Sequence, residues 1–233
     1  MPYDAPDERD LVNQLECEAI LFDLDGGLVD SMPPVDKAWM IWAARHGFDA
    51  ERIIAVAHGR RTEETIREIA SHLDCEAEAA DLERIEVEDA ENVLKVNGAN
   101  DLIASLPPEG WAVVTSGTRV LATARMRHTD LPIPRLLVAA EDVQNGKPDP
   151  ECYLKAAEML GVVASGCVVV EDAPVGVRAG RAAAMSVVAV AATHTPADLV
   201  EADAVVQALS SIHCRTVEQT GSRNLLVEVT VED

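Results

Sequence analysis

Two aspartates close the first strongly apolar run of the chain and are the clearest candidates for chemistry. The run reads AILFDLDGGLVDS from Ala19 to Ser31, and Asp23 and Asp25 stand one residue apart within it. Carboxylates are rarely buried unless they are paired or bind a metal, so a functional role is favoured over a turn or a helix cap. Because residues two apart on an extended segment point to the same side, both carboxylates can face one substrate.

Polar residues also follow three later apolar runs. WAVVTS ends in Thr115 and Ser116, RLLVAA leads into a loop with Lys147 in NGKPDP, and CVVVED ends in Glu171 and Asp172. If these runs are neighbouring parallel strands, their carboxyl ends bring four acids, one lysine and two hydroxyls into one cleft. Four acids together imply a divalent cation, and oxygen ligands without nearby His or Cys favour magnesium, Mg2+.

A cation, a lysine and hydroxyl donors together form a site for a phosphoryl group. One aspartate can attack phosphorus to form an aspartyl-phosphate, while the other protonates the leaving oxygen and later activates water. Each feature alone has a simpler explanation. Lys147 is then an ordinary loop lysine, the acids at 171–172 are solvated, and the hydroxyls at 115–116 cap a helix that starts near Arg119.

The elements that must position these residues follow from the same apolar runs. AILFDL, WAVVTS, RLLVAA, CVVVED and SVVAVA do not alternate, which is typical of strands buried on both faces of a parallel sheet. Helical patterns separate the later runs, at residues 120–127, 150–160 and 175–184. We therefore predict an α/β fold with a doubly wound parallel sheet.

The segment from about residue 33 to residue 97 has helical periodicity and no convincing strand. It predicts a small helical cap domain at residues 32–98, inserted after the first strand of an α/β core formed by residues 1–31 and 99–233. The tail NLLVEVTVED alternates apolar and polar residues, which predicts a terminal antiparallel or edge strand.

The composition limits the partners. The formal net charge of −22, from 41 acidic and 19 basic residues, disfavours nucleic acid and anionic membranes. An anionic substrate then requires locally gathered cations or a metal. The five cysteines are widely spread and form no CxxC pair, so we expect no disulfide framework or zinc site and a cytoplasmic setting. Neither a signal peptide nor a membrane span is indicated, and we expect a monomer or weak homodimer.

Four segments in order, FDLDGGLVDS, VVTSGT, GKPDPECYLKAAEMLG and VVVEDAPVGVRAG, resemble the four motifs of the haloacid dehalogenase superfamily of phosphohydrolases. One motif alone would be weak, but four in order, each after a predicted strand, are specific. A closer resemblance, which covers nearly the whole chain and includes HGRRTEETI, is to small phosphatases of glycerol phosphate, 2-deoxyglucose 6-phosphate and related sugar or polyol phosphates. It implies a Rossmann-like core, a helical cap, Mg2+ and a small phosphorylated metabolite as substrate.

The resemblance also implies roles for the strand-end residues. Asp23 corresponds to the nucleophile and Asp25 to the acid/base. Asp23, the backbone carbonyl of Asp25 and Asp172 correspond to the Mg2+ ligands, with Glu171 close by as an outer or alternate ligand. Lys147 corresponds to the residue that neutralises the phosphoryl group. Ser116 is the main candidate for binding the phosphoryl oxygens, and Thr115 and Gly117 are the further candidates.

The cap contributes four candidates for substrate selection, His58, Arg60, Arg61 and Thr62, because HGRRT is polar, basic and matched in the resembling branch. A solvated helix start is an equal alternative. Trp39 and Trp42 are predicted to pack the cap.

One departure and two rival functions remain. The family usually has Thr or Val where this chain has Gly27, which predicts a looser loop and lower activity. A β-phosphoglucomutase shares the core machinery but places a His where, aligned on Trp39, this chain has Val35. A catalytically impaired binding protein, with Gly27 as its lesion, is disfavoured because the acids and the lysine of the motifs are all retained.

Overall fold

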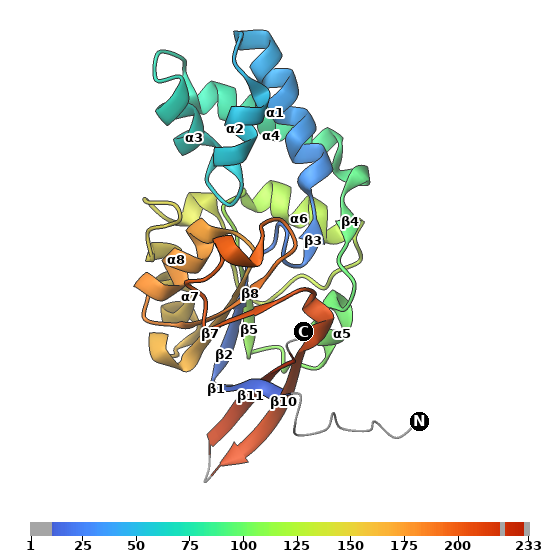
Figure 1. Cartoon of the computed structure of the whole chain (residues 1–233), viewed down its shortest axis with the longest axis vertical. Helices are drawn as coiled ribbons and strands as arrows, with labels where there is room; N and C mark the ends of the chain where they lie inside the picture. Colours follow the sequence, from blue (N-terminus) through green and yellow to red (C-terminus); the bar gives the residue numbers. More distant parts are fainter. Residues whose placement is uncertain (1–10, 220–221, 231–233) are drawn as a thin grey trace.

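A six-stranded parallel sheet forms the centre of the computed structural model, which describes residues 11–219 and 222–230 (Figure 1). The strand order is β6-β5-β2-β7-β8-β9, and every neighbouring pair is parallel. The strands are β2 (Ala19–Phe22), β5 (Trp111–Val114), β6 (Leu137–Val138), β7 (Cys167–Glu171), β8 (Ser186–Val190) and β9 (Ala204–Val206). The predicted doubly wound α/β fold is confirmed, and β2 lies at its centre.

Both faces of this sheet are covered, which explains why its strands do not alternate. Ile20 and Phe22 belong to one apolar cluster, and Ala19 and Leu21 belong to another. Helices α5 (Ala99–Ala104) and α6 (Arg119–His128) contribute to the first cluster, and α7 (Glu151–Leu160) and α8 (Pro174–Ala182) to the second. The three helices predicted after the second strand are therefore confirmed, within two residues at each end.

A group of four helices stands over the carboxyl ends of the strands (Figure 1). They are α1 (Met32–His46), α2 (Ala50–Ala57), α3 (Thr62–Ile69) and α4 (Cys75–Glu88). A separate apolar cluster holds them together, with Trp39 and Trp42 edge to face at 5.6 Å between ring centroids. We call this group the helical segment. The domain boundaries at residues 31/32 and 98/99 stay a prediction.

The expectation that residues 33–97 contain no strand is wrong at one point. Strand β4 (Leu94–Lys95) pairs antiparallel with β3 (Val29–Asp30), so a two-residue ribbon joins the two crossings between core and helical segment. Both residues of β4 are exposed, and a strand of this kind leaves no apolar pattern in the sequence.

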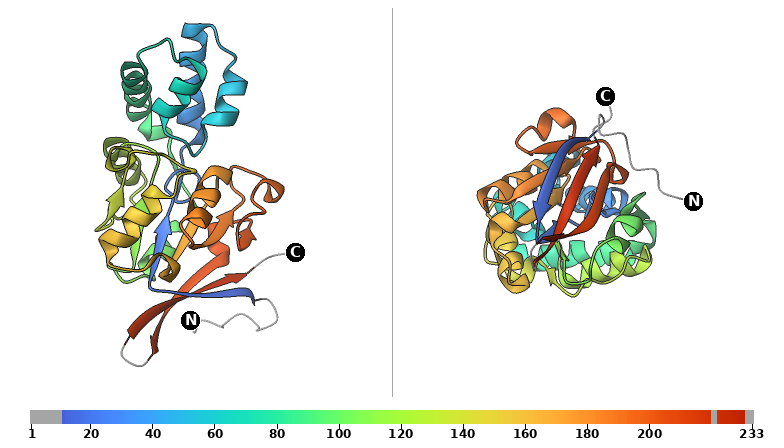
Figure 2. Two further views of the ribbon diagram at one scale, coloured as in Figure 1. Left: turned by 90° about the vertical axis from the view of Figure 1, so that its left-hand side faces the viewer. Right: turned by 90° about the horizontal axis from the view of Figure 1, so that it is seen from below.

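A three-stranded antiparallel sheet lies at the end of the molecule opposite the helical segment (Figure 2). Its order is β1 (Leu11–Cys17), β11 (Ser222–Thr230), β10 (Ile212–Gln219). The tail is predicted to form an antiparallel or an edge strand; the antiparallel strand is confirmed as far as Thr230, and β11 is the middle strand of its sheet. Residues 231–233 of that prediction lie outside the described part.

The remaining regular elements are short. Five 3-10 helices occupy Ala90–Asn92, Ala140–Asp142, Ala164–Gly166, Pro196–Asp198 and Leu209–Ser211 within the described ranges. No helix among the described residues is long and apolar enough to cross a membrane. All five cysteines are free, as their spacing predicted.

Candidate active site

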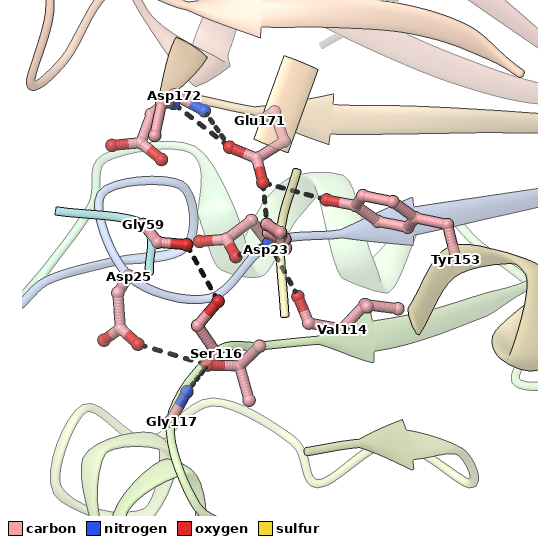
Figure 3. A network of polar contacts seen from close by, with 12 residues as sticks. Asp23, Asp25, Gly59, Val114, Ser116, Gly117, Tyr153, Glu171 and Asp172 are labelled. Atoms are coloured by element: carbon pink, nitrogen blue, oxygen red, sulfur yellow. Dashed lines mark hydrogen bonds and ion pairs between the residues drawn. The ribbon is translucent and has the colours of Figure 1, made fainter. Parts of the chain in front are cut away.

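The carboxyl end of β2 places Asp23 near Glu171 and Asp172 (Figure 3) and beside a buried lysine. Asp23 is 5% exposed and Lys147 is 2% exposed, and the Lys147 ammonium forms an ion pair with Oδ1 of Asp23. The same Nζ lies 2.6 Å from Oε1 of Glu171 at the end of β7 and 3.4 Å from the carbonyl oxygen of Val114 at the end of β5. Three strand ends therefore hold one cation between two carboxylates.

Glu171 is fully occupied by hydrogen bonds from the protein. Its Oε1 accepts from Lys147 and from the hydroxyl of Tyr153 at 2.9 Å, and its Oε2 accepts from the backbone N–H groups of Asp172 and Ala173 at 2.9 and 3.0 Å. A carboxylate with four donors has no need of a metal to satisfy it. This geometry favours an outer position for Glu171, where it orients Lys147.

Three carboxylates nevertheless gather closely enough to hold an ion. Asp23, Glu171 and Asp172 each place one oxygen within 4.8 Å of the others, and all three are buried. The Lys147 ammonium is paired with two of these three carboxylates, so the four groups together carry a formal charge of two negative units. A divalent cation with oxygen ligands matches both the donor set and the charge.

The electrostatics of the cluster agree with this reading. Burial raises the pKa of Asp23 to about 8 and outweighs the favourable charge of Lys147, with Glu171 and Asp25 adding to the rise. Burial likewise raises the pKa of the Asp172 carboxyl well above its usual range. For Lys147, burial alone would lower the pKa, but the carboxylates of Asp23 and Glu171 raise it further than burial lowers it. The acids therefore bind protons unless another cation neutralises them.

Gly26 allows the backbone of the loop after β2 to lie close to the carboxylate of Asp172. Its φ is +84°, and a Cβ added at this residue would lie 2.0 Å from Oδ2 of Asp172. Only glycine fits so close to a carboxylate in this conformation.

Asp25 also lines the cavity and has its own hydrogen-bond partners. Its Oδ1 accepts from the hydroxyl of Ser31 at 2.8 Å and from Nη1 of Arg125 at 2.6 Å. Its Oδ2 has a longer bond, 3.3 Å, from the hydroxyl of Thr115. Arg125 also forms an ion pair with Glu86 of α4.

The residues after β5 form the next side of the site (Figure 3). The Thr115 hydroxyl accepts from the backbone N–H of Gly117 at 3.0 Å, and the Ser116 hydroxyl donates to the carbonyl of Gly59 at 2.8 Å. The simpler explanation of the hydroxyls at 115–116 as helix caps is wrong. Helix α6 begins at Arg119 as expected, but its cap is Thr118, whose hydroxyl accepts from the N–H of Leu121 at 3.2 Å.

A cavity of about 60 Å³ lies between the helical segment and these strand ends. The core lines it with Asp23, Asp25 and Ser116, and the helical segment lines it with Val35 and Trp39. A buried water needs roughly 10–15 Å³ on this measure, so the space holds a few waters or a phosphoryl group. A larger substrate requires the helical segment to move.

Comparison with known proteins decides the family. Residues 20–190 match the family model described as haloacid dehalogenase-like hydrolase. The chain belongs to this family. It is 43% identical over 203 residues to hexitol phosphatase A of Escherichia coli (strain K12), which covers 85% of this chain and 94% of that protein. It is 38% identical over 191 residues to glycerol-1-phosphate phosphohydrolase 2 of Saccharomyces cerevisiae, which covers 77% of this chain and 76% of that one.

A solved structure shows a further likeness in fold. A β-phosphoglucomutase from Clostridium difficile superposes with a TM-score of 0.74 at 21% identity, over 83% of this chain and 92% of that one. At this identity the likeness concerns the fold alone. The family match and the named relatives confirm the predicted family and the predicted enzyme class, a phosphoric monoester hydrolase.

The four candidates for substrate selection in this hydrolase separate into two groups. His58, Arg60 and Thr62 line the cavity, but Arg61 does not. Its Nη1 instead donates to the carbonyl of Gln144 at 2.9 Å, which ties the helical segment to the core. His58 lies 3.0 Å from Asp36 and Arg60 lies 2.7 Å from Glu68, so both side chains are paired within the helical segment.

Three residues at this hydrolase site were not predicted from the sequence: Arg125, Glu86 and Tyr153. All three are nearly or fully buried. Arg125 could have been predicted, because it lies between Ala122 and Met126 on the same helix, and both of these residues pack into the apolar core. A charged residue on an apolar helix face is unusual enough to require a partner. Trp39 packs the helical segment as predicted and, in addition, lines the cavity.

Proposed function

We propose that the protein is a Mg2+-dependent phosphatase that hydrolyses a small sugar or polyol phosphate monoester through an aspartyl-phosphate on Asp23. The observation that carries this proposal is the buried Asp23 carboxylate, paired with Lys147, beside Asp172 and on the wall of the cavity. The names of the two relatives, a hexitol phosphatase and a glycerol-1-phosphate phosphohydrolase, support the substrate class.

Asp23, Asp172 and the backbone carbonyl of Asp25 are the residues that would hold Mg2+, with Glu171 outside them. When bound, the ion supplies charge neutralisation and Lewis acidity to the phosphoryl oxygens. The excess of two negative charges in the acidic cluster supports a divalent ion in this place.

In the first half of the reaction, a carboxylate oxygen of Asp23 attacks phosphorus and the bond from phosphorus to the ester oxygen breaks. Asp25 gives its proton to the departing alkoxide, so the product leaves as an alcohol. Lys147 balances charge on Asp23 and on the transferring group. Ser116, Thr115 and Gly117 are proposed to bind the phosphoryl oxygens, and Ser116 then exchanges its bond to Gly59 for one to the substrate.

In the second half, Asp25 takes a proton from a water molecule that attacks the phosphorus of the aspartyl-phosphate. The bond between Asp23 and phosphorus breaks, which releases inorganic phosphate and restores both carboxyl groups. Closure of the helical segment excludes other water during these steps.

The helical segment is proposed to select the leaving group through His58, Arg60 and Thr62, which line the cavity. The strongly acidic surface supports a small metabolite rather than nucleic acid or a membrane as partner. The cytoplasmic setting rests on the five free cysteines, and the monomeric or weakly dimeric state stays a prediction.

The mutase alternative is disfavoured by one side chain at the cavity. Val35 lines it, and the hydrocarbon side chain of valine transfers no proton to or from a sugar hydroxyl. The impaired-protein alternative conflicts with the buried, paired condition of Asp23 and Lys147.

A phosphate-release screen with Mg2+ tests the proposal. The substrates are a hexitol phosphate, glycerol 1-phosphate, 2-deoxyglucose 6-phosphate and nucleoside monophosphates, with Asp23→Asn as the inactive control. We expect release from at least one sugar or polyol phosphate and none from the control. No release from any ester would refute the phosphatase, and equal release from Asp23→Asn would refute the nucleophile. Conversion of β-glucose 1-phosphate to glucose 6-phosphate would favour the mutase.

A further inference from the structure

Arg125 joins the acid/base candidate to the helical segment through two ion pairs. Its side chain is 3% exposed, with Nη1 at 2.6 Å from Oδ1 of Asp25 and Nη2 paired with Glu86. Glu86 is 5% exposed, and Arg125 is its only hydrogen-bond partner in the part of the chain that the structure describes. One guanidinium thus connects two carboxylates that belong to different parts of the fold.

The connection crosses the boundary between helical segment and core. Glu86 lies on α4, Arg125 lies on α6, and α4 stands directly over α6 in two views (Figures 1 and 2). Each of these helices packs into a different apolar cluster. The two charged groups meet only because the helical segment is closed over the core.

The position of this contact at the cavity links it to substrate entry. The cavity of about 60 Å³ leaves little room beyond a phosphoryl group. Glu86 and Arg125 both line that cavity. Opening it for a substrate therefore separates α4 from α6, and closing it rebuilds the ion pair.

The two oxygens of Asp25 are held unequally. Ser31 and Arg125 both donate to Oδ1, while Thr115, at 3.3 Å, is the single donor to Oδ2 within residues 11–219 and 222–230. Two short bonds fix the orientation of the carboxyl group through one oxygen, which leaves the other oxygen less engaged and free for proton transfer. If Glu86 leaves, Arg125 loses one of its two anchors and holds Oδ1 less firmly.

We propose that Arg125 is a positioning residue for Asp25, and that Glu86 locks Arg125 in place only when the helical segment is closed. Proton donation to the leaving group is thereby coupled to closure over the substrate. The inference rests on the proposed phosphatase function, in which Asp25 is the acid/base.

The test compares two esters that differ in their need for an acid. Glycerol 1-phosphate, or the hexitol phosphate if the screen ranks it higher, releases an alkoxide that needs a proton. Acetyl phosphate is small and releases acetate, which departs without one. The constant kcat/KM reports the steps through phosphoryl transfer to Asp23, so it isolates the half-reaction in which Asp25 acts as an acid.

Glu86→Met is the main variant, and Glu83→Met is its matched control. Glu83 also lies on α4 and also reaches α6, where it accepts from the hydroxyl of Thr118 at 2.8 Å, but this link does not lead to Asp25. For Glu86→Met we expect kcat/KM to fall about tenfold with the polyol ester and by no more than about twofold with acetyl phosphate. Glu83→Met should change the two esters equally.

The double variant Glu86→Met/Arg125→Met removes both buried charges together and so avoids an unpaired one. We expect kcat/KM to fall about 100-fold with the polyol ester, again with a much smaller loss for acetyl phosphate. Thermal unfolding checks that each variant folds, and Glu86→Gln replaces Glu86→Met if the latter does not.

Equal losses for the two esters, or the same behaviour of the position 86 and position 83 variants, would overturn the inference. A wild-type protein that releases phosphate from neither ester would overturn the proposed function instead, so the two failures are distinguishable.

Discussion

The two sides of the cavity are built in different ways. On the core side, Asp23, Lys147 and Glu171 are buried, and Lys147 donates hydrogen bonds to both carboxylates, which lie at the ends of two strands. On the side of the helical segment, His58 and Arg60 are partly exposed and paired with partners of their own segment. A buried charged cluster on the core side and partly exposed side chains on the other side suit different tasks. In the proposed function, the core performs the phosphoryl transfer and the helical segment distinguishes among leaving groups.

The largest effect on the core side is expected when the positive charge of Lys147 is removed. We expect Lys147→Met to lower kcat by about 10³-fold and stability by about 3 kcal/mol, because Asp23 and Glu171 lose the charge that pairs them. Adding Glu171→Gln should restore part of the stability without restoring kcat. Urea unfolding and phosphate release measure the two quantities. A double variant that recovered activity would show that Lys147 serves the fold alone.

Mg2+ should stabilise the core side in a pH-dependent way. The raised pKa values of Asp23, about 8, and Asp172 mean that the metal-free folded state binds more protons than the unfolded chain. Its stability therefore falls as the pH rises from about 4 to about 8. Mg2+ must displace those protons, so the increase in Tm on adding it should be larger at pH 8.5 than at pH 6.

Two variants separate the ligands in that experiment. Asp172→Asn should abolish most of the Mg2+-induced increase in Tm, because a charged ligand is lost. Asp25→Asn should retain it, because only the backbone carbonyl of Asp25 is proposed as a ligand, while activity is lost. An equal loss of the Tm increase in both variants would contradict the proposed ligand set.

Substitutions in the helical segment at the cavity should change the choice among substrates more than the rate of phosphoryl transfer. We expect His58→Ala or Arg60→Ala to change the ratio of kcat/KM between glycerol 1-phosphate and a hexitol phosphate by about tenfold, with little effect on acetyl phosphate. Arg61→Ala is the matched control, since Arg61 contacts Gln144 and does not line the cavity, and it should move both polyol esters equally. A changed ratio for Arg61→Ala alone would reverse this assignment.

The difference between the two sides also explains what the sequence could predict. Residues such as Asp23, Lys147 and Asp172 follow apolar runs, and parallel strands bring their carboxyl ends together regardless of the loops between them. Their gathering at one edge was therefore predictable. By contrast, Arg61 and Thr62 are neighbours in HGRRT, yet only Thr62 lines the cavity. Which side of a helix start faces the core depends on packing that one sequence does not encode locally.

The links between the two sides were the least predictable part. Glu86 and Arg125 are 39 residues apart and meet through tertiary packing alone. The same holds for β1, which reads LVNQLEC without a regular alternation and pairs with a strand more than 200 residues later in the chain. No rule of residue spacing predicts long-range pairs of this kind. Arg125 alone could have been noticed, because it is a charged residue on an apolar helix face.

Gly27 gives the smallest expected effect and corrects a simple expectation. Conformational entropy alone predicts that Thr or Val at this position would tighten the loop and raise activity. In this structure, however, a Cβ at position 27 would lie 2.8 Å from the carbonyl oxygen of Asp23, a backbone atom that cannot rotate away. We therefore expect Gly27→Ala to lower stability by about 1 kcal/mol and kcat by a few-fold, since it displaces Asp23, the proposed nucleophile. Gly47→Ala is the matched control for activity, because a Cβ there meets no atom within 4 Å, although its φ of +75° costs stability. A rise in both Tm and kcat for Gly27→Ala would show that loop entropy outweighs the contact with Asp23.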